Sequence, residues 1–310
     1  TAAVGGVTLT HFEAWVGAIS FALQVYFDFS GYTDMAIGAA RMFGVKLPIN
    51  FNSPFKSITI SQFWRTWHMT LTRFMREYVY FPLSGWLQNL TLEEETGPRT
   101  PGDINLVTTT TTVIVMLLIG IWHGAGWSFL IWGAINGIYL IGYQQWREFR
   151  RRLGHDLRKT TWWSQLLGWF LTFVMWCSAL VWARSDSVFT ALKMWQGMYF
   201  GGWTWPDLAA EQLWSDVLLP HVGLKLSGVL FWIPVLLAIA VLTPNSQQWL
   251  EKYQSALDHY VLKTPKNLYQ KFWLRWRWQI NPYWAVIVAV VSTMAIIAVG
   301  NEKEFIYFQF

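Results

Sequence analysis

Residues Ile104 to Tyr143 read INLVTTTTTVIVMLLIGIWHGAGWSFLIWGAINGIYLIGY and contain no Lys, Arg, Asp or Glu. A hydrocarbon core about 30 Å thick requires roughly 20 apolar residues in a helix, so this stretch is long enough for two spans. The glycines around His123 divide it in the middle. The stretch therefore predicts a helix pair over residues 104–145 that turns back at GIWHGAGW.

The rest of the chain has the composition of a membrane protein. Apolar residues make up 54% and charged residues 13% of the sequence, against about 45–50% and about 25% in soluble domains. Further apolar runs cover Ala14–Ala40, Trp163–Ala183, Val222–Leu242 and Tyr283–Gly300, and Met194–Trp203 is short enough to be re-entrant. Together these runs predict an all-α, multi-pass helical bundle with six spans, in a single transmembrane domain over residues 1–310.

Charge in the loops predicts the orientation of these spans. Three stretches are rich in Lys and Arg, namely 41–77, 146–159 and 251–277, whereas 184–221 is acidic. Basic loops stay in the cytoplasm, so the acidic loop and both chain ends are expected outside. The turn at His123 then lies on the outer side or partway down. Because the basic residues flank apolar spans, the net charge of +5 indicates contact with anionic membrane lipid rather than nucleic acid.

His123 is the one side chain in the uncharged stretch that titrates near pH 7. Ionisable groups at membrane depth are costly and are generally retained for function. From chemistry alone three roles stay open: a buried packing residue, a metal or haem ligand, or a catalytic base. The glycines at 120, 124 and 126 suit either close helix packing or a substrate cavity.

A second histidine, His68, lies in a segment with a helical apolar stripe. The stripe over residues 57–83 predicts one amphipathic helix on the cytoplasmic side, with Ser61 as its cap and Pro82 near its end. Such a helix ordinarily lies flat in the membrane interface. The functional alternative is that it dips toward the core and presents His68 beside a substrate cavity.

Two aspartates interrupt the first apolar run. Asp28 and Asp34 lie within YFDFSGYTDMAIG, on different faces of a helix, and Gly31 between them could break that helix. The simplest interpretation is that they cap helix ends or pair with a buried arginine. The following LPINFNSPF, residues 47–55, is turn-rich and leads into the basic helix.

Several classes of site are absent from the sequence. Cys177 is the single cysteine, which excludes an intramolecular disulfide and a cysteine metal cluster. There is no Walker loop, GxGxxG, HExxH or GxSxG motif. Two rivals to an enzyme remain: a transporter with Asp28, Asp34 and His123 as relay groups, and a haem protein ligated by His68 and His123.

Five motifs in order resemble the membrane-bound O-acyltransferase (MBOAT) family. They are VYFDFSGYTDMAIG, NFNSPF, FWRTWHMTLTRFMREYVYFPL, GIWHGAGWSFLIWGAINGIYL and the closing FIYFQF. The nearest branch contains the alginate O-acetylation protein I and other polysaccharide O-acetyltransferases. Family members usually have further N-terminal spans, so the chain is expected to lack them.

The resemblance implies a helical bundle with a transmembrane acyl tunnel and assigns residues to it. His123 corresponds to the family's intramembrane histidine, the expected catalytic base, and His68 to its second active-site polar residue. The resemblance also implies arginines that meet the donor's phosphates and tryptophans that wall the tunnel. The expected substrate-binding residues are Trp64, Arg65, Trp67, Arg73, Arg76, Trp122, Gly124, Asp28 and Asp34. No metal or bound cofactor is expected.

The resemblance further implies an acetyl group moved from a cytoplasmic donor, acetyl-CoA, across a bacterial inner membrane. A periplasmic acetyltransferase would then modify an exopolysaccharide such as alginate. D-alanyl transfer from a carrier protein to teichoic acid is the alternative within the family. The residues that follow His123 favour the polysaccharide branch, because D-alanyl transfer proteins end sooner after that motif.

Overall fold

A computed structural model describes residues 9–94, 101–202, 218–219, 224–257, 271–273 and 277–299. Within these ranges the molecule is helical apart from one two-residue antiparallel pair, β1 (Leu218–Leu219) and β2 (Leu224–Lys225). The all-helical prediction is therefore confirmed. The closing FIYFQF motif lies outside the described residues.

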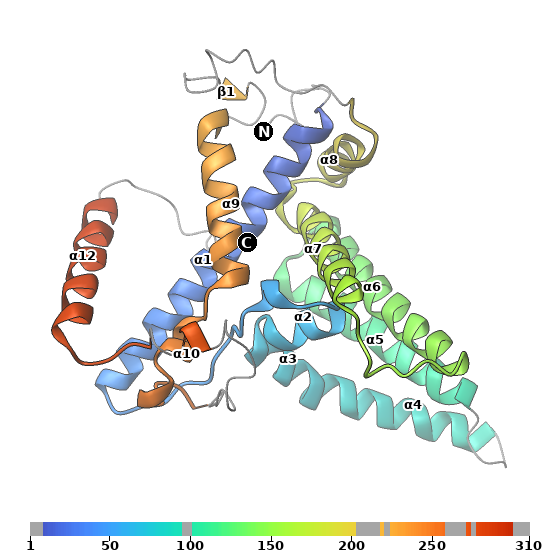
Figure 1. Cartoon of the computed structure of the whole chain (residues 1–310). Coiled ribbons are helices and arrows are strands. Elements are labelled where there is room, and N and C mark those ends of the chain that lie inside the picture. Colours follow the sequence, from blue (N-terminus) through green and yellow to red (C-terminus); the bar gives the residue numbers. More distant parts are fainter. Residues whose placement is uncertain are drawn as a thin grey trace.

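The uncharged stretch forms two helices, α5 (Pro101–His123) and α6 (Trp127–Arg152), that pack along each other (Figure 1). Glycines set how closely they approach. A Cβ on Gly120 would lie 2.5 Å from the carbonyl oxygen of Phe129, and one on Gly133 would collide with the Met116 carbonyl. The predicted pair over 104–145 is present and is longer at both ends.

The first apolar run forms one unbroken helix, α1 (His11–Met42), so the expected interruption at DFSGYTD does not occur. Thr10 and Glu13 form a capping box at its start. Gly31 lowers helix propensity by about 1 kcal/mol, which the packing of a long helix offsets. Inside the motif, the Thr33 hydroxyl donates to the Ser30 carbonyl at 3.0 Å and stays within the helix.

The predicted amphipathic helix over 57–83 is divided. The helix α2 (Ile60–Thr66) is capped by Thr59, not by Ser61, and the chain leaves helical geometry at Trp67 and His68. Helical structure then resumes through α3 (Met69–Met75), a π-helical turn η2 (Arg76–Tyr80) and α4 (Phe81–Glu94). Pro82 does not end the helical structure. Proline lacks the N–H that an α-helix uses to bond four residues back, and the π turn that ends at Tyr80 shifts the hydrogen-bond register just before it.

The remaining helices are α7 (Trp162–Arg184), α8 (Val188–Phe200), α9 (Leu226–Leu242), α10 (Ser246–Trp249) and α12 (Pro282–Val299), with 3₁₀ turns η1 (Pro54–Lys56) and η3 (Glu251–Tyr253). Only two described helices are long and apolar enough to cross a membrane by themselves, over Asn105–His123 and Trp162–Arg184. Gly228–Leu242 and Pro282–Ile297 are shorter apolar helices. Six predicted spans thus reduce to two clear ones in the described part of the chain.

Figure 1 shows α1 and α9 crossing at the centre, α5, α6 and α7 side by side, and α2, α3 and α4 across the lower end. The helix α12 lies at the side of this body (Figure 1), and its Trp284 ring meets that of Trp249 in α10, with centroids 5.8 Å apart. The segment after α9 is fastened to the N-terminal part by polar contacts. The Lys56 ammonium donates to the Thr243 carbonyl at 2.5 Å, and the Asn245 amide donates to Asn52 and Ser53, each at 3.0 Å.

Candidate acyl-transfer site

The structure brings the two predicted histidines together on one indole ring. The centroid of the His68 ring lies 6.1 Å from that of Trp122, and the His123 ring lies 4.8 Å from it, both edge-on. His68 lies at the junction of α2 and α3, whereas His123 is the last residue of α5. Two motifs that are 55 residues apart therefore meet at one place.

His68 has a left-handed backbone conformation, with φ of 42°, which is uncommon for a residue other than glycine. Asn50 holds the chain there. Its carbonyl accepts from the Met69 amide at 3.0 Å, and its side-chain oxygen accepts from the Thr70 hydroxyl at 2.6 Å. Asn50 was not predicted as a site residue. Its position in the turn-rich NFNSPF motif was the signal that could have indicated it.

Aromatic rings line the other sides of both imidazoles. Phe29 from α1 meets the His68 ring edge-on at 4.9 Å, and Trp132 from α6 meets the His123 ring at 5.0 Å. Neither ring was predicted, although Trp132 lies in the same uncharged stretch as His123. Gly124, which follows His123, has no room for a side chain because the Phe129 ring occupies that space.

The predicted tryptophans Trp64 and Trp67 belong to a buried aromatic cluster beside the histidines. The ring centroids of Trp64 and Trp132 are 6.0 Å apart, and those of Trp67 and Trp176 are 4.7 Å apart. The indole N–H groups of Trp64, Trp132 and Trp176 are buried without a hydrogen-bond partner in the described part of the chain. The Trp132 ring contacts both Trp64 and His123 and so links the cluster to that histidine.

His68 is held neutral by its surroundings. Burial, and secondarily the imidazole of His123, lower the pKa of His68 from 6.5 to about 4. Its Nδ1 is buried and has no hydrogen-bond partner within the described residues. A buried, unpaired nitrogen is costly for folding but is available to bind or relay a proton.

The three predicted arginines are not gathered at the histidines. Arg65 is exposed on α2, and Arg73 is partly buried in the last turn of α3. Arg76 forms an exposed ion pair with Glu77 at 3.2 Å. No contact of these three side chains with His68 or His123 is present in the described structure.

The predicted aspartates Asp28 and Asp34 both lie on α1. Asp34 accepts hydrogen bonds from Ser246 at 2.6 Å and Gln247 at 3.1 Å, and it lines a cavity of about 320 Å³ between α1 and the end of α9. Asp34 therefore anchors α10 through Ser246 and Gln247, and not through the buried arginine that was the simplest expectation. Asp28 is partly buried on the same helix.

Residues 7–92 match the family model described as MBOAT, membrane-bound O-acyltransferase family. This match includes His68, Asn50 and the aromatic residues of α1 and α2. The resemblance to the MBOAT family is confirmed. The match includes His68 and ends before His123.

Named relatives extend the similarity over His123. A peptidoglycan O-acetyltransferase of Helicobacter pylori is 32% identical over 98% of this chain and 50% of its own length. A probable alginate O-acetylase of Azotobacter vinelandii is 36% identical over 70% of this chain and 40% of its own length. A teichoic acid D-alanyltransferase of Streptococcus thermophilus is 29% identical over 49% of this chain and 37% of its own length. The chain thus spans half or less of the length of these curated relatives.

Proposed function

We propose that this chain contains the acyl-transfer centre of an MBOAT O-acetyltransferase, with His123 as the catalytic base. The observation that carries the proposal is the meeting of His68 and His123 on the Trp122 ring. A pair of imidazoles from separate motifs among aromatic rings suits proton transfer better than helix packing alone.

The proposed chemistry is transfer of an acetyl group to a hydroxyl. His123 takes the proton of the acceptor hydroxyl as that oxygen bonds to the thioester carbonyl carbon. The carbon–sulfur bond then breaks, and the imidazolium returns the proton to the thiolate that leaves. General-base assistance of this kind is worth about 10²–10⁴-fold. His68 relays this proton or orients the thioester through its unpaired Nδ1.

Acetyl-CoA on the cytoplasmic side is the proposed donor. Arg65, Arg73 and Arg76 are proposed to attract its phosphates from the basic stretch of α2 to η2, since guanidinium groups bind phosphate well. The proposed setting is a bacterial inner membrane, with a periplasmic acetyltransferase partner that passes the acetyl group to a cell-envelope or secreted polysaccharide. Alginate and peptidoglycan are both candidate acceptors, because the named relatives act on one or the other.

D-alanyl transfer to teichoic acid is the second candidate. It is favoured by the two teichoic acid D-alanyltransferases, which are 29% and 27% identical to this chain. The O-acetylation relatives are 32–36% identical and match more of the chain, so O-acetyl transfer is the preferred proposal.

Replacement of the base tests the proposal. His123→Ala should leave the protein folded in the membrane and abolish transfer of labelled acetyl from acetyl-CoA in inverted vesicles that contain the complete acetylation system. His68→Ala should also reduce transfer. His155→Ala, on the loop after α6, is the matched control and should retain the full rate.

Two results would reject the proposal. Normal acetylation by the His123→Ala protein would show that His123 is not the catalytic base. A Soret band from the purified protein would instead indicate a haem ligated by His68 and His123. D-alanine incorporation without acetyl incorporation would select the second candidate.

A further inference from the structure

A groove between α6 and α7 has the chemistry of a lipid site and is separate from the histidines. Its volume is about 530 Å³, within the usual range for small-ligand sites. Its lining includes neither histidine and none of the rings that contact them. The groove therefore needs an explanation other than acyl transfer.

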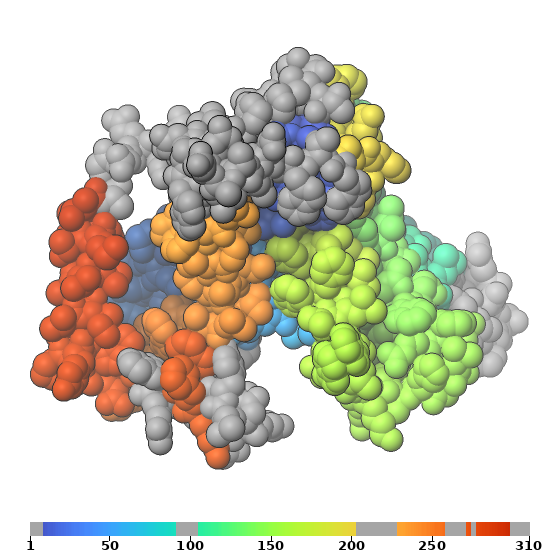
Figure 2. Space-filling model, turned by 45° about the horizontal axis from the view of Figure 1, so that its top comes forward, coloured from blue at the N-terminus to red at the C-terminus, as the bar shows by residue number. Residues whose placement is uncertain are grey.

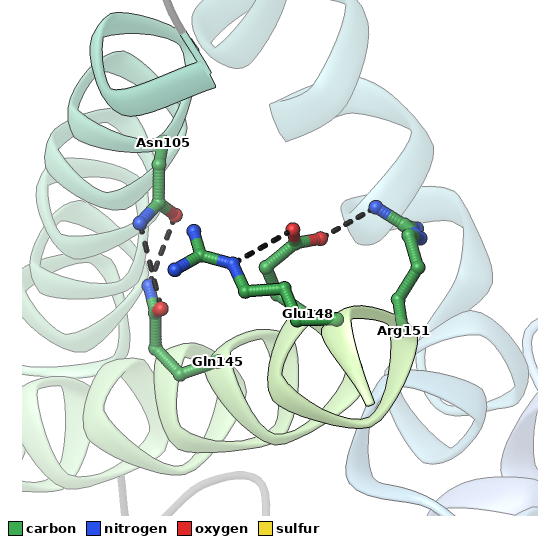
Figure 3. Close-up of polar contacts among 5 residues, drawn as sticks. Asn105, Gln145, Glu148 and Arg151 are labelled. Carbon is green, nitrogen blue, oxygen red and sulfur yellow. Dashed lines mark hydrogen bonds and ion pairs between the residues drawn. The ribbon is translucent and has the colours of Figure 1, made fainter. Parts of the chain in front are cut away.

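One end of this groove is basic. Arg147 and Arg150 line it, and neither forms an ion pair within the described residues. By contrast, their neighbours Arg151 and Arg152 are both paired with Glu148, and neither lines the groove; Figure 3 shows the pair of Glu148 and Arg151. Arg151 and Arg152 thus share one carboxylate, whereas Arg147 lies over the Tyr143 ring and Arg150 donates to the neutral acceptor His155 Nδ1 at 3.5 Å, so neither charge in the groove lining is paired with an acid in the described structure.

The other end of the groove is apolar and open. Ile138 and Leu171 are 64% and 45% exposed, and Met175 lies deeper along the same wall. Gly142 is an exposed part of the lining, and no atom lies within 4 Å of a Cβ built on it. Trp146, at the boundary between the two ends, is typical of the membrane–water interface. Figure 2 shows α6 and α7 together on one face of the molecule.

We propose that this groove binds one anionic phospholipid of the cytoplasmic leaflet. Its phosphate pairs with Arg147 and Arg150, and an acyl chain lies along Ile138, Gly142 and Leu171. The positive-inside rule places this end of α6 in the cytoplasm, where anionic headgroups attract arginine. A free, soluble phosphate compound would not explain an exposed apolar wall that continues from the basic end.

Native mass spectrometry of the detergent-purified protein tests the site. When dioleoylphosphatidylglycerol is the probe, the wild type should retain one lipid molecule. When dioleoylphosphatidylcholine is supplied instead, it should retain none. In the Arg147→Gln/Arg150→Gln double variant, the fraction of protein that retains this lipid should fall about tenfold or more. Gly142→Leu should also lower the retention of lipid, because the leucine side chain would occupy space in the groove.

Arg151→Gln/Arg152→Gln is the matched control, because it removes the same charge from the same helix end. It should retain the lipid as the wild type does. Equal loss in the two double variants, no retained lipid in the wild type, or displacement of the lipid by acetyl-CoA would each overturn the proposal. These outcomes do not depend on acetyl transfer, so they are separate from the test of His123.

Discussion

The backbone of His68 is the most specific feature at the scale of single residues. A left-handed conformation at a residue other than glycine persists where the surrounding structure determines it. Here the Asn50 carbonyl and side chain hold the next two residues, and the His68 carbonyl accepts from the Thr72 amide at 3.0 Å to start α3. Asn50 is therefore a positioning residue for His68.

Asn50→Leu is expected to lower acetyl transfer about tenfold or more, because a misplacement of about 1 Å at a reacting group can cost about 100-fold. The acceptor oxygen for Thr70 is lost, whereas the backbone bond to Met69 remains. Asn50→Asp keeps that oxygen and should retain most of the rate. Transfer assays on both variants, at equal protein levels, measure this difference. Equal rates for the two would show that the bond to Thr70 does not position His68.

The two histidines also show how far residue-level prediction could reach. His123 was identifiable because it is an ionisable group in an uncharged span, and His68 because it lies at the margin of an apolar stripe. Neither pattern could reveal that Trp122, Trp132 and Phe29 would contact them. Those contacts depend on the packing of α1, α5 and α6 around the α2–α3 junction.

At the scale of elements, the close approach of α5 and α6 determines where His123 lies. Gly120 and Gly133 face backbone carbonyls of the partner helix with no space for a methyl group. Small residues that allow helices to approach in this way are typical of membrane proteins. The helix pair was predictable from its apolar stretch, but this contact was not, since several glycines in that stretch could have faced either side.

Gly133→Ala should destabilise the protein by about 1–3 kcal/mol, because backbone atoms must move to admit the methyl group. Gly142→Ala makes the same substitution on the same helix where nothing lies within 4 Å of the new Cβ. That control should be neutral or stabilising by up to about 1 kcal/mol. Thermal unfolding in detergent measures both changes. Equal unfolding midpoints for the two variants would contradict the proposed close contact.

The amphipathic segment 57–83 illustrates the limit of periodicity at this scale. Its apolar stripe predicts helix, and helix is present on both sides of His68. The spacing of apolar residues does not detect a break when helix resumes directly after it. The break at His68 is imposed by Asn50, which lies 18 residues earlier. The continuation past Pro82 follows from a π turn, which has no clear signature in sequence.

At the scale of the whole molecule, polar contacts at the end of α9 join distant parts of the chain. Lys56 in η1 donates to Thr243, and Ser246 and Gln247 donate to Asp34 on α1. The Leu257 amide also donates to the Leu47 carbonyl at 2.9 Å. These contacts fasten the C-terminal part to the region matched by the MBOAT model.

Lys56 predicts a pH dependence of stability. Burial lowers its pKa from 10.5 to about 8. Because the folded pKa is below the unfolded one, the unfolded chain binds more protons between these values, so the free energy of unfolding rises with pH in that window. The wild type should therefore gain stability relative to Lys56→Met as pH rises from about 8 toward 10.5.

Thermal unfolding of the two proteins over a pH series measures this gain. Comparison with Lys56→Met cancels the titration of all other groups that the two proteins share. Below about pH 8 the difference between their midpoints should be constant, since Lys56 is then protonated in both states. A constant difference across the whole range would show that Lys56 keeps its ordinary pKa.

The sequence by itself determined the helical class, the apolar helix pair, the two histidines and the resemblance to the MBOAT family. These follow from local composition and from motifs that occupy consecutive residues. Only the tertiary structure decided that His68 and His123 meet on Trp122, that Asp34 anchors α10, and that Arg147 and Arg150 face a groove while Arg151 and Arg152 are paired. The physical reason is that contacts between helices depend on how the helices pack, and that local sequence does not decide which side chains of one helix find a partner.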